Sequence, residues 1–73
     1  MNPMLHIRKN VFAVTQAEMA QIARASQPAY SRWENGETTP TLNQMDHIRS
    51  EALRRGLNWD DSWFFEAPME AAQ

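Results

Sequence analysis

The stretch Thr15–Gly36, TQAEMAQIARASQPAYSRWENG, decides how this chain of 73 residues folds. Thr15 and Glu18 have the spacing of a capping box, in which each side chain accepts a hydrogen bond from the other residue's amide, so a helix begins here. A second helix begins at Ser26, a favoured N-cap residue, and Gly36 ends it in the left-handed conformation. Because only residues 24–26 separate the two segments, the sequence predicts two short helices joined by a tight turn.

The flanking residues also indicate helices, because apolar residues recur at spacings of three and four without the alternation of strands. We expect a first helix over residues 4–12, a fourth from Pro40 or Leu42 to Arg55, and a short fifth over residues 59–64. The buried face of the fourth helix is expected to carry Leu42, Met45, Ile48, Ala52 and Leu53. The sequence therefore predicts an all-α fold of five short helices, with one domain over residues 1–65 and a flexible tail over residues 66–73.

Composition excludes several kinds of functional site. Cysteine is absent, which removes disulfides, zinc–thiolate sites and thiol catalysis. His6 and His47 lack a second ligand at metal spacing, and no glycine-rich loop or nucleophile motif occurs. The longest apolar run spans residues 11–14, far short of the roughly 20 residues of a membrane span. We expect an intracellular protein that is not an enzyme, is not inserted in a membrane, and requires no metal, cofactor or small-molecule ligand.

Charge is distributed unevenly along the chain, whose formal net charge is −2. Residues 1–55 contain all seven Lys and Arg residues and five acids. The segment from Gly56 to Gln73 carries four acids and no base. The body is therefore mildly basic and the C-terminal segment is acidic. Such asymmetry suggests different partners for the two parts.

The spacing of the two central helices is that of a helix-turn-helix, whose second helix enters the major groove of DNA. Thr15–Gly36 resembles this motif in the Cro/C1-type (XRE-like) phage repressors: Thr15-Gln16 at the start, small Ala20 at the helix contact, inward Tyr30 and Trp33, and a final Glu34-Asn35-Gly36. The resemblance extends over roughly residues 4–56. It implies a lambda-repressor-like domain that binds a palindromic double-stranded DNA operator as a homodimer, in the bacterial cytoplasm or the nucleoid of a phage-infected host.

The second helix of the motif carries residue types that suit base recognition. Gln27 can pair with adenine N6 and N7, and Arg32 can bind guanine O6 and N7 through two hydrogen bonds. A phosphate contact is the alternative for Arg32, and a role in helix initiation is the alternative for Pro28. The expected base-reading residues are Gln27, Pro28, Ala29, Ser31 and Arg32.

Phosphate contacts are expected on either side of that helix. Gln16 begins the first helix of the motif, where free amides and the helix dipole attract anions. The resemblance implies that Gln16 also braces Gln27 and that Asn35 is a second phosphate clamp. The full candidate set is Gln16, Ser26, Asn35, Arg8, Thr38 and Thr39.

At three further positions the chain differs from the residues usual in the family. Lys9 lies where the family often carries an arginine, so the resemblance implies a structural ion pair between Lys9 and Glu34. The family usually has glycine where this chain has Ala13 and Arg24, and a positive φ at Arg24 would be strained.

Four of the seven aromatic residues lie in the short C-terminal segment, at Trp59, Trp63, Phe64 and Phe65. We expect this helix, about residues 57–65, to form a dimer interface, because exposed apolar patches mark contact surfaces. Packing of Trp59 and Phe64 against the first and fourth helices is the alternative. A different function, as an antitoxin or adaptor that holds another protein through this segment, also fits the sequence.

Overall fold

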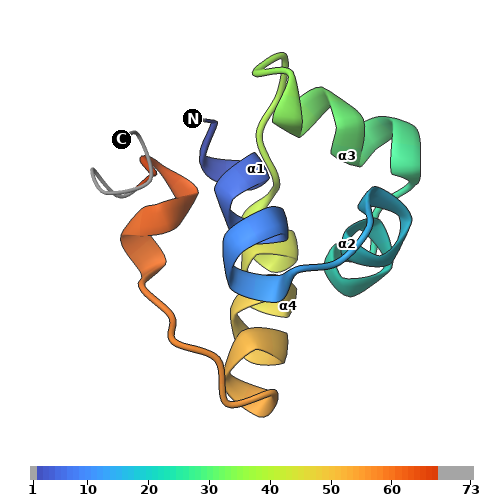
Figure 1. Ribbon diagram of the computed structural model, residues 1–73. Helices are drawn as coiled ribbons and strands as arrows, with labels where there is room; N and C mark the ends of the chain where they lie inside the picture. Colours follow the sequence, from blue (N-terminus) through green and yellow to red (C-terminus); the bar gives the residue numbers. More distant parts are fainter. Residues whose placement is uncertain (1, 68–73) are drawn as a thin grey trace.

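A computed structural model of the chain describes residues 2–67 (Figure 1). It contains α1 (Pro3–His6), the π-helical segment η1 (Ile7–Phe12) that continues it, α2 (Gln16–Ala23), α3 (Gln27–Glu34), α4 (Leu42–Arg54) and the 3-10 turn η2 (Asp61–Phe64). No strand occurs within residues 2–67. The all-α prediction is confirmed, but the described residues form four α-helices, because the fifth predicted helix is only a single 3-10 turn. Residues 68–73 of the predicted tail lie outside the described residues.

The helix boundaries follow the capping residues found in the sequence. Both capping boxes form: Thr15 with Glu18 at the start of α2, and Thr41 with Gln44 at the start of α4. The fourth helix thus begins at Leu42, and Pro40 lies before it. The Ser26 side chain caps α3 by accepting from the Ala29 amide at 3.2 Å. Local hydrogen bonding therefore fixes where these three helices begin.

Left-handed backbone conformations connect the helices. Gly36 and Gly56 have φ of 78° and 71°, as expected for glycines that end helices. Ala13 and Arg24 have φ of 56° and 59°, so the two positions where the family usually has glycine keep the left-handed geometry despite their side chains. The turn between α2 and α3 is therefore preserved, with local strain at Arg24.

The core lies where α1 and η1, α2, α3 and α4 meet, with α2 and α3 on one side of the molecule and η2 on the other (Figure 1). Ile7, Met19, Tyr30 and Ile48 are its largest fully buried side chains. Ala20 and Ala23 are also buried, and their small size lets α2 approach its neighbours closely. The helix-turn-helix is thus held on a common hydrophobic core.

The predicted buried face of α4 is only partly correct. Ile48 and Ala52 are buried, Met45 is half-buried, but Leu42 is 82% exposed and Leu53 is 59% exposed. Met45, Ile48 and Ala52 are three and four residues apart and share one face, because successive residues turn by about 100°. Leu42 and Leu53 are six and five residues from Ile48, so they point away from it.

The C-terminal aromatic segment packs back on the first helical segment. The ring centroids of Trp59 and Phe12 lie 6.5 Å apart, and those of Trp63 and His6 lie 5.1 Å apart. The ring centroids of Phe64 and Trp59 lie 5.2 Å apart, whereas Phe65 is 74% exposed. Trp59, Trp63 and Phe64 are therefore half-buried against the core, and only Phe65 projects freely from the predicted interface.

Candidate nucleic-acid interface

Helix α3 presents two chemically different faces. Tyr30 and Trp33 are buried, and their rings pack edge to face with centroids 5.4 Å apart. The Tyr30 hydroxyl donates to the Met4 carbonyl at 3.2 Å, and burial raises the pKa of this phenol. This inner face anchors α3 to the core and fixes which side of the helix faces solvent.

The outer face of α3 carries the side chains expected to read bases. Gln27, Pro28 and Arg32 are exposed, while Ala29 and Ser31 are half-buried. Gln27 and Arg32 are five residues apart on a helix that rises about 1.5 Å per residue, so both lie within the length of one major-groove contact. The structure thus places Gln27 and Arg32 in solvent, while Ser31, the third polar candidate for base recognition, is half-buried.

A hydrogen-bonded chain connects the first helical segment to the start of α3. Arg8 binds the Glu34 carboxylate through Nε at 2.5 Å and through Nη2 at 3.2 Å. The same carboxylate accepts from Gln16 Nε2 at 3.1 Å, and Gln16 Oε1 accepts from Gln27 Nε2 at 3.4 Å. Gln16 therefore braces Gln27, and Glu34 sets the orientation of the Gln16 amide.

The ion pair in this chain of contacts corrects the predicted pair of Lys9 with Glu34. Arg8 lies one turn after buried Met4 and shares its inward face, whereas Lys9 is turned away and exposed. Burial works to raise the pKa of Glu34, but hydrogen bonds and the charge of Arg8 outweigh it and lower that pKa. The Arg8–Glu34 pair thus stays ionised and holds α1, α2 and α3 together.

The six candidate phosphate ligands differ in exposure. Gln16 is half-buried, and its amide contacts Glu34 and Gln27. Ser26, Asn35, Thr38 and Thr39 are exposed on either side of α3. Asn35 Nδ2 lies 3.4 Å from the Glu37 carboxylate, a weak contact that a phosphate oxygen can replace. Arg8 differs from this exposed group, because its guanidinium is bound to Glu34 and to the Val14 carbonyl and its side chain is only 15% exposed. The structure gives Arg8 an ion pair with Glu34, and its role as a phosphate ligand stays a prediction.

Other kinds of site receive no support from the part of the chain that the structure describes. Residues 2–67 contain no cluster of three or more His, Asp or Glu side chains placed to hold a metal ion. No helix in this range is both long and apolar enough to cross a membrane.

Comparison with protein families matches residues 13–46 to the family described as Helix-turn-helix. This match covers α2, the turn, α3 and the start of α4, so the resemblance of this segment to the Cro/C1-type motif is confirmed. Comparison with curated proteins and with solved structures found no match. Residues 13–46 therefore carry a helix-turn-helix of the XRE type, with α2 and α3 as its two helices, and this motif supports a DNA-binding regulator.

Proposed function

We propose that this protein is a sequence-specific transcriptional repressor that binds a palindromic operator as a homodimer. The observation that carries the proposal is the arrangement of α3, whose inner face is anchored by Tyr30 and Trp33 and whose outer face exposes Gln27 and Arg32. Bound in the major groove, such a helix blocks access of other proteins to the same DNA. This mode of action requires binding and no catalytic step.

Gln27 contacts Gln16 through a weak hydrogen bond of 3.4 Å and keeps an amide that suits an adenine. One hydrogen of its Nε2 is directed to Gln16, which leaves the second hydrogen and Oε1 free. A glutamine amide pairs with adenine by donating to N7 and accepting from N6. This weak contact favours one orientation of the Gln27 amide without fixing it.

Arg32 supplies the strongest base contact that we propose. It is the exposed cation on the outer face of α3, and the guanidinium matches the O6 and N7 acceptors of guanine. Neutral donors from Ser26, Asn35, Thr38 and Thr39 would bind the flanking phosphates. With so few free cations, one copy binds weakly, and two copies on half-sites about 10 bp apart compensate for this.

The test compares Arg32→Ala with Asn35→Ala on duplexes that differ at single base pairs. We expect Arg32→Ala to lose about 1–3 kcal/mol on the preferred duplex and to become indifferent at one base pair. Asn35→Ala serves as the matched control, because a phosphate ligand weakens binding to every duplex by a similar factor. Equal losses on all duplexes for Arg32→Ala would contradict the proposed base contact.

A further inference from the structure

His6 is a titratable side chain that is buried between α1 and the turn η2. It is only 6% exposed. Its ring packs edge to face against Trp63 of η2, with centroids 5.1 Å apart, and η2 lies beside α1 (Figure 1). The imidazole is therefore part of the contact that holds the C-terminal aromatic turn on the rest of the domain.

The surroundings of the imidazole suit its neutral form. Nδ1 lies 3.0 Å from Asn10 Nδ2, an amide nitrogen that only donates, so Nδ1 accepts and the ring proton is on Nε2. Nε2 is buried and has no hydrogen-bond partner within residues 2–67. The exposed Asn10 amide can turn its oxygen toward a protonated Nδ1, but the Nε2 proton stays unpaired. A positive charge on this ring is therefore buried without compensation, which is costly.

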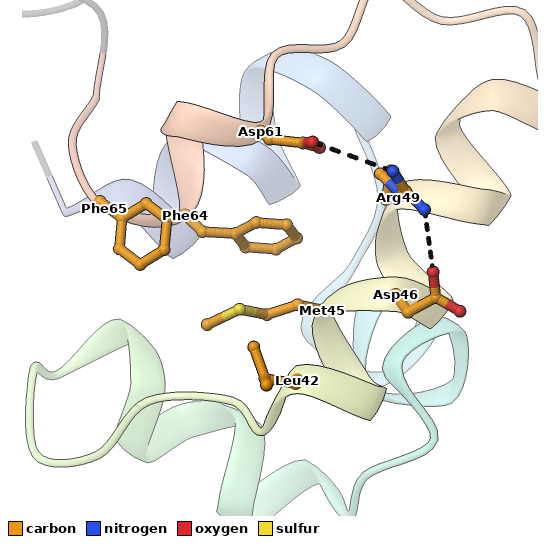
Figure 2. A pocket seen from close by; sticks show the side chains of 7 residues that line it. All are labelled: Leu42, Met45, Asp46, Arg49, Asp61, Phe64 and Phe65. Atoms are coloured by element: carbon orange, nitrogen blue, oxygen red, sulfur yellow. Dashed lines mark hydrogen bonds and ion pairs between the residues drawn. The ribbon is translucent and has the colours of Figure 1, made fainter.

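The charged side chains of η2 have other partners. Asp60 caps the turn by accepting from a backbone amide at 2.9 Å, and Asp61 accepts from Trp59 Nε1 at 2.7 Å. Asp61 also lies 3.9 Å from Arg49 Nη1 of α4 (Figure 2). Glu66, which follows the turn, is exposed. These carboxylates are thus engaged with other groups or with solvent and do not pair with a protonated His6.

The other neighbouring elements supply no counter-charge either. In the segment that carries His6, Arg8 is a cation bound to Glu34, and Lys9 is an exposed cation. In α3, burial raises the pKa of the Tyr30 phenol, so this group stays neutral. Burial lowers the pKa of His6 from its ordinary value, because it disfavours the charged imidazole.

We infer that His6 is a pH-sensitive switch for the C-terminal turn: the neutral imidazole holds η2 against α1, and protonation of the imidazole releases η2. Release lets water solvate the charged ring, which removes the cost of burying it. The released turn exposes Trp63 and Phe64, so an aromatic surface that packs on the domain at neutral pH becomes accessible in acid. The inference concerns the packing of the turn and does not depend on the proposed function.

The turn can separate while the helix-turn-helix stays folded. η2 is a single 3-10 turn of four residues, too short to be a stable unit by itself. The helix-turn-helix has its own connections to the first helical segment, because the Tyr30 hydroxyl donates to the Met4 carbonyl at 3.2 Å and Arg8 pairs with Glu34. Neither contact involves η2.

The direction of the pH effect follows from the lowered pKa of His6. In the released turn the imidazole is solvated and titrates near its ordinary value of about 6.5. Above that pH it is neutral in both states, and the packed state is fully favoured. As pH falls below about 6.5, the released state binds the proton more readily, so release becomes more favourable. The effect is complete once pH is below the lowered pKa that His6 has in the packed state.

The experiment is an NMR titration of the full chain, labelled with ¹⁵N, from about pH 8 to about pH 5. Order parameters of the backbone amides of η2 report whether the turn is packed, and the Trp59 and Trp63 indole resonances report on its rings. Trp33, buried in the helix-turn-helix, is the internal control. His6→Phe keeps a ring in the contact and removes the titrating group. His47→Phe is the matched control, because the other histidine lines a hollow beside α2.

We expect the order parameters of η2 to fall from about 0.85 to below about 0.6 as His6 titrates, while the Trp33 resonance stays unchanged. His47→Phe should behave like the original chain, whereas His6→Phe should keep η2 ordered throughout. A turn that stays ordered in the original chain at about pH 5, or that is released equally in His6→Phe, would overturn the inference. Loss of all three indole resonances together would also contradict it, because the whole domain then unfolds. The titration of the original chain decides the question even if His6→Phe fails to fold.

Discussion

Replacement of Glu34 by glutamine tests the contact network that holds α3 against α2 and the first helical segment. The carboxylate accepts two hydrogen bonds from Arg8 and one from Gln16, and its side chain is only 8% exposed. Glu34→Gln keeps the shape of the side chain and removes its charge. Arg8, which is 15% exposed, then lacks a counter-ion.

The expected loss of stability follows from the burial of the Arg8–Glu34 ion pair. Removing one partner of a fully buried ion pair destabilises a protein by about 3–5 kcal/mol. Because Arg8 retains some solvent and glutamine still offers one acceptor, we expect a loss of about 2–3 kcal/mol here. A domain of this size has a total stability of roughly 4–11 kcal/mol, so the loss is readily measured.

Urea denaturation at several pH values is the assay, with Glu37→Gln as the control on an exposed glutamate of the neighbouring loop. Since the pKa of Glu34 is lowered in the folded state, its stabilising effect is complete above the pKa of the unfolded carboxyl group. That stabilising effect is lost as pH falls through the lowered pKa that Glu34 has in the folded state. The difference between the original chain and Glu34→Gln should therefore be large at neutral pH and disappear in acid. A difference no larger than that of Glu37→Gln, or one that persists unchanged in acid, would show that the Arg8–Glu34 pair does not stabilise the fold in this way.

Two further predictions concern the backbone around the motif. Arg24→Gly should stabilise the fold by about 0.5–1 kcal/mol. Glycine removes the strain of the positive φ at this position, and this gain exceeds the cost of the larger conformational entropy of the unfolded chain. Gln21→Gly, in the exposed interior of α2, should destabilise it by about 1 kcal/mol, and a loss of stability in Arg24→Gly as well would contradict the account. Thr41→Ala removes the cap on the Gln44 amide and should cost about 1 kcal/mol, seen as a melting point lowered by about 4–8 °C. Thr39→Ala should leave the melting point unchanged, and equal shifts for the two variants would place the start of the helix elsewhere.

The helix boundaries could be predicted from the sequence because they depend on local hydrogen bonds. A threonine with Glu or Gln three residues later needs nothing distant to form a capping box, and both boxes of this chain form. The family resemblance likewise located the turn and the outer face of α3. Its expected brace from Gln16 to Gln27 is present at 3.4 Å.

The remaining errors concern contacts between segments that are distant in the sequence. Arg8 and Lys9 are adjacent cations, and only the packing of the first helical segment decides that Arg8 reaches Glu34. Apolar residues occur on more than one side of α4, and only the packing of α4 against the core decides that Ile48 and Ala52 are buried while Leu42 is exposed. Similarly, composition predicts an aromatic segment without showing that Trp63 packs on His6.

Selection of bound duplexes from a random-sequence pool, at a stated salt concentration, tests most directly whether α3 reads DNA bases. If α3 reads bases, the pool becomes enriched in a palindrome with half-sites about 10 bp apart, bound about a thousandfold or more tightly than random duplex. A pool that stays random after repeated rounds, with equal affinity for every duplex, would show that α3 does not read bases.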